Sequence, residues 1–225
     1  MVIGTCDGFT LSVARTPTEL DLAAGIRYRA YRATGALPEC ASARFLDAFD
    51  QAPDARTVLV WHGDRPVAAT RTLVSRDTAR ADLTAALAFG DVIREVIPPQ
   101  AVVIEANRFV VDPEVAGMNR RAIWPMIRAN LMRCAFEQGD YFVAALRPAH
   151  LAFYARVLRL SVASEERVYP GLRTGMHLMT ADLHTQVPLI MAEFTALQAT
   201  HAERSALFGE VSRVQPDHPH ARPGL

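Results

Sequence analysis

An apolar stretch, Val103 to Val111, contains two residues able to do chemistry, Glu105 and Arg108. Burying either charge alone is costly, so each needs a partner within the fold. They are three residues apart, which places them on opposite faces of a regular strand. For both to reach one site, the strand needs a bulge near Ala106 and Asn107. A bulge also frees a backbone N–H that can stabilise an oxyanion, although a buried structural ion pair explains the charges equally well.

Further charged side chains lie among apolar neighbours. Arg27 and Tyr31 are four residues apart on a predicted helix, so they share one face. Asp47 and Asp50 are three apart in an aromatic segment, and Arg71 lies in a predicted strand. With the two charges of the apolar stretch they make three arginines and three carboxylates. These predict either one neutral cluster or separate solvated charges, and spacing alone does not distinguish the two.

The composition excludes several other chemistries. Acidic and basic residues number 24 each, and every basic residue is an arginine, so no lysine is present to form a Schiff base or bind a P-loop phosphate. The balanced charge indicates no nucleic-acid partner. Three cysteines and seven histidines lack metal-ligand spacing. We therefore expect no metal site, no permanently bound cofactor and no catalytic role for histidines such as His150.

The sequence also bears on location. No apolar run approaches the roughly 18 residues of a membrane span, and the first ten residues lack the basic start and apolar stretch of a signal peptide. The scattered, unpaired pattern of the cysteines is typical of a reducing compartment. A cytoplasmic protein, either a monomer or a homodimer, is the resulting prediction.

Hydrophobic periodicity predicts a mixed sheet with helices on it, an α/β (α+β) fold. Thr16 is a predicted N-cap, with Glu19 completing a capping box. The predicted strands are 9–13, 57–61, 66–74, 101–111, 141–146, 160–168 and 175–183. The predicted helices are 17–32, 79–96, 118–138, 149–158 and 187–197, with a short helix or turn at 44–50. Pro125 predicts a kink or a later start of its helix.

Three parts of the chain are expected. Residues 1–185 form the mixed sheet and its flanking helices. Residues 186–211 form an extra C-terminal helix, packed on the domain or on a partner. The roof of an acyl pocket is an alternative role for its apolar stripe, 187–197. Residues 212–225, rich in proline and histidine, form a disordered tail.

The charged residues occur in an order that resembles two related families. They are Ile26-Arg27-Tyr28-Arg29-Ala30-Tyr31, Phe45-Leu46-Asp47 with Asp50, Arg71, and Glu105-Ala106-Asn107-Arg108-Phe109. The set is similar to the pattern of the bacterial acyl-homoserine lactone (autoinducer) synthases and the N-acyl amino acid synthases, both of the GNAT fold, over about residues 20 to 160. Autoinducer synthases have a tryptophan where this chain has Thr34-Gly35-Ala36-Leu37-Pro38, and a serine in place of Asn107. The resemblance therefore favours the second family.

The resemblance implies roles for the matching positions. Glu105 is the implied catalytic base, and the segment from His150 to Leu158 is similar to the GNAT helix whose tyrosine, here Tyr154, protonates the leaving thiolate. A core aromatic is the alternative for Tyr154. Arg159 stands where GNAT enzymes usually have glycine. The implied substrate-binding residues are Arg27, Tyr31, Asp47, Asp50, Arg71, Asn107 and Arg108.

The phosphate-binding loop of coenzyme A-dependent relatives corresponds to residues 113–121, which hold one glycine and two arginines. Such a loop fits a single phosphate at a helix N-terminus, as in the phosphopantetheine of acyl carrier protein, and equally an inactive relative. The implied phosphopantetheine-binding residues are Phe109, Val110, Val111, Gly117, Arg120 and Arg121.

The expected activity is transfer of a long acyl chain from acyl carrier protein, a partner and co-substrate, to the amine of an amino acid or similar small molecule. Three alternatives stay open: an N-acyltransferase that uses acetyl- or acyl-coenzyme A, an acyl-homoserine lactone synthase, and a catalytically silent GNAT-like module that binds acyl thioesters.

Overall fold

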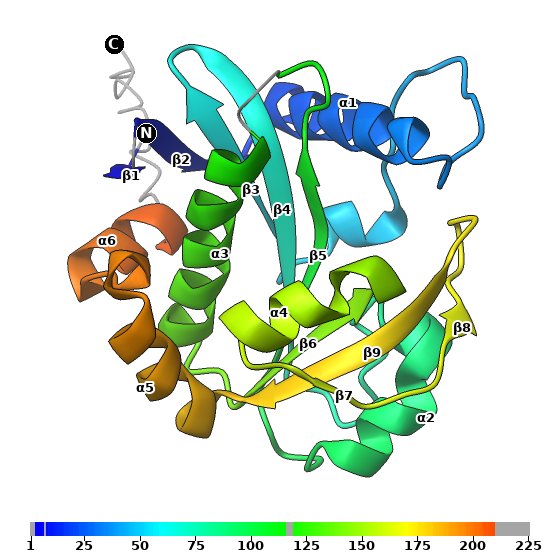
Figure 1. The fold of residues 1–225 in the computed structure, drawn as a ribbon, viewed down its shortest axis with the longest axis vertical. Helices are drawn as coiled ribbons and strands as arrows, with labels where there is room; N and C mark the ends of the chain where they lie inside the picture. The colour runs from blue at the N-terminus through cyan, green and yellow to red at the C-terminus, as the bar shows by residue number, and fades with distance from the viewer. Residues whose placement is uncertain (1–2, 7, 116–118, 210–225) are drawn as a thin grey trace, which may run out of the picture.

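The computed structural model describes residues 3–6, 8–115 and 119–209. Among these residues, nine strands form one sheet in the order β1-β2-β3-β4-β5-β6-β9-β7, and β8 also pairs with β9 (Figure 1). Neighbouring strands are antiparallel except β5 and β6, which are parallel, so the predicted mixed sheet is confirmed. The strands are β1 Ile3–Cys6, β2 Phe9–Val13, β3 Arg56–His62, β4 Arg65–Ser75, β5 Val103–Val111, β6 Tyr141–Leu146, β7 Ser161–Val162, β8 Arg167–Val168 and β9 Gly175–Asp182.

Helices cover both faces of the sheet. Helices α1 (Pro17–Ala33) and α2 (Ala86–Val96) pack on one face. Helices α3 (Asn119–Phe136), α4 (Leu151–Val157), α5 (Leu183–Glu193) and α6 (His201–Phe208) pack on the other. Because apolar side chains meet β5 from both faces, the strand is central and buried, in keeping with its valine- and isoleucine-rich composition.

Local signals account for several boundaries. Thr16 and Glu19 form the predicted capping box at the start of α1. Gly63, with φ of 59°, makes the tight turn that joins β3 and β4, the two strands predicted at 57–61 and 66–74, into a hairpin. Between α1 and β3, a short 3-10 helix, Ala48–Gln51, carries its own capping box from Asp47 and Asp50. The two aspartates are thereby held on one turn.

The helix predicted over 79–96 begins only at Ala86. Arg80 adopts a left-handed φ of 58°, and its guanidinium donates hydrogen bonds to the carbonyl oxygens of Ser75, Pro98 and Pro99. These contacts hold the preceding segment in turns, so tertiary structure overrides its helical periodicity.

The other differences lie at segment ends. Helix α3 runs from Asn119 to Phe136 with Pro125 inside it, so of the two alternatives predicted from Pro125, a kink or a later start, the later start is wrong. The strand predicted over 160–168 pairs only at β7 and β8. The C-terminal helix predicted from 186 is broken into α5, a 3-10 turn and α6, because Thr200 and Glu203 form a new capping box. The predicted tail, 212–225, lies outside the described residues. Within the described part of the chain, no helix has both the length and the apolar character needed to cross a membrane.

Candidate active site

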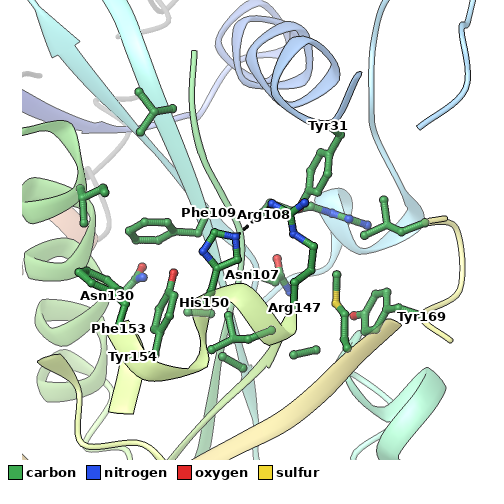
Figure 2. A pocket seen from close by; sticks show the side chains of 18 residues that line it. Tyr31, Asn107, Arg108, Phe109, Asn130, Arg147, His150, Phe153, Tyr154 and Tyr169 are labelled. Carbon is green, nitrogen blue, oxygen red and sulfur yellow. Dashed lines mark hydrogen bonds between the residues drawn. The ribbon is translucent and has the colours of Figure 1, made fainter. Parts of the chain in front are cut away.

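Strands β5 and β6 pair at one end and separate at the other. Their parallel register runs from Val103–Tyr141 to Glu105–Val143, after which β5 stays with β4 and β6 stays with β9. A cavity of about 460 Å³ lies at the separation (Figure 2). Its lining comprises Tyr31, Ala106, Asn107, Arg108, Phe109, Val111, Ile123, Asn130, Ala144, Ala145, Leu146, Arg147, His150, Phe153, Tyr154, Tyr169, Leu172 and Met176. The edge of β5 that leaves β6 therefore turns its backbone toward this cavity.

A bulge in β5 decides which side chains face which layer. Arg71 of β4 is opposite Asn107 and Ala69 is opposite Val110, so β5 has one extra residue between these pairs. Arg108, within the bulge, has a left-handed φ of 50°. The predicted bulge is thus present, one to two residues later than expected. It leaves Asn107 and Arg108 both contacting residues on the α1 and α2 side of the sheet.

The bulge lets the predicted charged residues form one network. Arg71 is fully buried and donates to Asp47 at 2.6 and 3.0 Å, while its Nη1 lies 2.9 Å from an Asp50 oxygen. Arg27, also fully buried, donates to Asp50 at 2.6 Å, and Arg108 donates to Asp47 at 2.5 Å. The three arginines thus neutralise the two aspartates, so the alternative of separate solvated charges is wrong. Glu105 joins the network only through Asn107, whose Oδ1 accepts from Arg71 at 2.9 Å.

Hydrogen bonds in the network keep the Asp47 carboxylate ionised. Burial raises the pKa of Asp47, but the hydrogen bonds and charges of Arg71 and Arg108 outweigh it and hold that pKa well below its usual range. Arg108 also stacks on Phe45, with 4.2 Å from the guanidinium carbon to the ring centroid, and lies 5.8 Å from the ring of Tyr31. Arg108 is thereby fixed in one orientation at the cavity wall.

Glu105 connects to the cavity only through a neighbour. Its carboxylate accepts from the Thr84 hydroxyl, from the Ala85 N–H at 3.1 Å and from Asn107 Nδ2 at 2.8 Å. The residue is fully buried and does not line the cavity, whereas Asn107 does. Its predicted role as base remains a prediction, and any such role has to act across Asn107.

Aromatic side chains form the opposite wall. Tyr154 of α4 makes edge-to-face contacts with Phe109 at 5.9 Å and Phe153 at 5.3 Å between ring centroids. Burial raises the pKa of Tyr154, so its phenol stays protonated at neutral pH. Arg159, where GNAT enzymes usually have glycine, has φ of 53° and therefore keeps the left-handed turn at the end of this segment.

The predicted phosphopantetheine residues divide into three groups. Phe109 and Val111 line the cavity, whereas Val110 packs toward α1. Gly117 and the side chain of Arg120 lie outside the part of the chain that the structure describes. Arg121 is exposed at the start of α3, with its guanidinium carbon 5.7 Å from the centroid of the Phe9 ring.

Four polar residues of the cavity were not predicted as part of the site. Asn130 lies inside α3 and accepts from Thr70, and Tyr169 follows β8, so neither has a local signal. Arg147 and His150 come directly after β6, where a polar residue at a strand end was the available signal. Burial, helped by the charge of Arg147, lowers the pKa of His150, so its imidazole is neutral at pH 7.

Comparison with solved structures defines the class of fold. The structure of FeeM, an N-acyl amino acid synthase from uncultured soil microbes, is 16% identical, with a TM-score of 0.66 over 82% of this chain and 97% of that one. The acyl-homoserine lactone synthase LasI is 15% identical, with a TM-score of 0.56 over 92% and 98%. An acyl-CoA N-acyltransferase from Pseudomonas aeruginosa is 15% identical, with a TM-score of 0.51 over 76% and 97%. The fold is therefore that of the GNAT acyltransferases, as predicted.

The family is shown by the sequence itself. The model of the N-acyl amino acid synthase FeeM family matches residues 23–182. This chain belongs to that family, which supports acyl transfer to an amine as its activity. A search of curated protein sequences finds no match.

Proposed function

We propose that the protein transfers a long acyl chain from acyl carrier protein to the amine of an amino acid. The observation that carries the proposal is the cavity at the separation of β5 and β6, with protonated Tyr154 on one wall and Arg108 and Asn107 on the other. A thioester carbonyl at the open edge of β5 meets backbone N–H groups suited to an oxyanion. The sequence of residues 113–121, with one glycine and two arginines, supports a donor that has one phosphate.

The proposed reaction is direct aminolysis. The amine nitrogen attacks the thioester carbonyl and forms a tetrahedral oxyanion, while the surplus proton leaves the nitrogen. Collapse of the oxyanion breaks the C–S bond, and Tyr154 protonates the departing thiolate, so the products are an N-acyl amide and a free thiol. The charged network fixes the wall of the cavity at which the amine is proposed to bind; its members are Arg27, Asp47, Asp50, Arg71 and Arg108.

The base is proposed from two candidates. Glu105 takes the amine proton through a water bound at Asn107, in keeping with its 2.8 Å contact to that side chain. His150 is the second candidate, because it lines the cavity itself and its lowered pKa keeps the ring neutral. Against it, Arg147 donates a hydrogen bond of 3.1 Å to the Nε2 atom of His150, which leaves that lone pair occupied.

The test incubates the purified protein with acyl-carrier-protein thioesters of several chain lengths and pooled L-amino acids, and identifies products by mass spectrometry. We expect a long-chain N-acyl amino acid, with turnover at least about 100-fold lower in Glu105→Gln. Glu95→Gln, at an exposed position on α2, is the matched control and should leave turnover unchanged.

Each other outcome redirects the assignment. Full activity in Glu105→Gln with loss in His150→Gln would make His150 the base. Products from acyl-coenzyme A alone would overturn acyl carrier protein as donor. A folded protein that binds thioesters but releases no amide from any donor would indicate a silent binding module.

A further inference from the structure

The charges around the cavity do not balance. Among its lining residues the charged side chains are Arg108 and Arg147, and the lining contains no Asp or Glu. Arg108 is neutralised by Asp47, at 2.5 Å. Arg147 has no carboxylate within ion-pair distance among the described residues, and its recorded partner is the Nε2 atom of His150. One positive charge is therefore left facing the cavity.

The position of Arg147 relates this charge to the reaction. Arg147 follows β6 directly and is the N-cap of the 3-10 turn Pro148–His150, whose proline holds the backbone in place. Figure 2 shows its side chain rising from that strand end toward the side of the cavity where Tyr31 and Arg108 lie. Ala144, where β6 parts from β5, is three residues earlier. The guanidinium thus faces the same cavity as the open edge of β5, where the thioester carbonyl is proposed to bind.

An arginine without a counter-charge suits one kind of ligand group. Guanidinium groups bind carboxylates through paired N–H···O bonds, which are stronger than neutral hydrogen bonds. An α-amino acid carries its carboxylate on the carbon next to its amine, so both groups reach one small site together. Leu172 and Met176 also line the cavity and leave apolar surface for a side chain.

We propose that Arg147 binds the α-carboxylate of the acceptor and thereby selects amino acids over other amines. The proposal rests on the function proposed above and names the residue that selects its acceptor. The bound carboxylate neutralises the free guanidinium and turns the amine toward the carbonyl. Amines without a carboxylate, and diamines above all, bring a positive charge to an already positive cavity and are disfavoured.

The test compares each of the twenty L-amino acids with its primary amide, using wild type and Arg147→Met. The donor is an acyl-N-acetylcysteamine thioester, which carries no phosphate, run beside the acyl-carrier-protein thioester. We expect kcat/KM for amino acids to fall roughly 10- to 100-fold in Arg147→Met, and for amides to change less than about threefold. The matched control is Arg156→Met, an exposed position on α4 outside the cavity, which should change neither value.

Three results would overturn the proposal: equal use of amino acids and amides by wild type, an equal loss for both acceptors in Arg147→Met, or a loss confined to the carrier-protein donor, which would assign Arg147 to the donor phosphate. Equilibrium binding of amino acids and amides, measured by calorimetry, tests the same preference without turnover. Carboxylate-dependent binding without any acyl transfer would refute the proposed function and leave the Arg147 assignment standing.

Discussion

The two walls of the cavity use charge in opposite ways. On the wall built from α1, β4 and β5, buried arginines and carboxylates neutralise one another through short contacts. On the wall built from β6 and α4, aromatic rings surround Tyr154, and Arg147 lacks a carboxylate partner among the described residues. Charges that are paired with each other fix the local structure, whereas a charge without an ion-pair partner is available to bind a ligand. The first wall is thus expected to govern stability and the second to govern turnover and acceptor choice.

The largest effect is expected from breaking the first wall. Arg71→Met removes the buried guanidinium that contacts both Asp47 and Asp50, so carboxylate oxygens of the two aspartates lose a charged hydrogen-bond donor. It should lower the free energy of unfolding by about 3–5 kcal/mol, measured by urea denaturation. Arg147→Met, on the second wall, should change it by less than about 0.5 kcal/mol.

A double variant separates charge from packing at Arg71. Adding Asp47→Asn to Arg71→Met removes one carboxylate along with one guanidinium. The double variant should therefore lose less stability than the sum of the two single variants. Simple additivity, or equal stability of Arg71→Met and wild type, would contradict the contrast between the walls.

A smaller effect, on rate rather than stability, is expected from Tyr154→Phe. Removing the hydroxyl deprives the thiolate of its proton donor, so kcat with alkyl thioesters should fall about 100-fold while unfolding is nearly unchanged. A thiophenyl ester, whose thiolate leaves without a proton, should show a much smaller loss. Tyr28→Phe, outside the cavity, is the control. An equal loss with both esters would assign Tyr154 to packing alone.

The smallest effect is expected from a change at Arg159, in the turn between α4, which carries Tyr154, and β7. The left-handed backbone of Arg159 is unfavourable for a residue with a Cβ atom. Its ion pair with Glu193, at 3.0 Å, is partly exposed and adds little to the free energy of unfolding. Arg159→Gly should therefore raise the unfolding free energy by about 0.5 kcal/mol without changing turnover. Thermal and urea unfolding measure the change, and a loss above about 1 kcal/mol would show that the ion pair dominates.

Sequence reasoning reached further for the first wall than for the second. Arg27, Asp47, Asp50, Arg71, Glu105 and Arg108 carry visible local signals, because a charge within an apolar segment needs a partner. Asn130, Tyr169, Arg147 and His150 carry none or almost none, and His150 was set aside for lack of metal spacing. A residue that lines a cavity but belongs to no ion pair or motif can be identified only from the tertiary structure, which brings distant segments together.

The sequence by itself determined most of the elements, the family and the membership of the charged network, since these follow from periodicity, capping and the cost of buried charge. Only the tertiary structure decided that Glu105 stays behind Asn107, that the bulge falls at Arg108, and that Arg147 faces the cavity without a carboxylate partner among the described residues. Local patterns specify what a segment needs to bury, whereas the register between strands and the contacts of distant segments specify which groups remain open to a substrate.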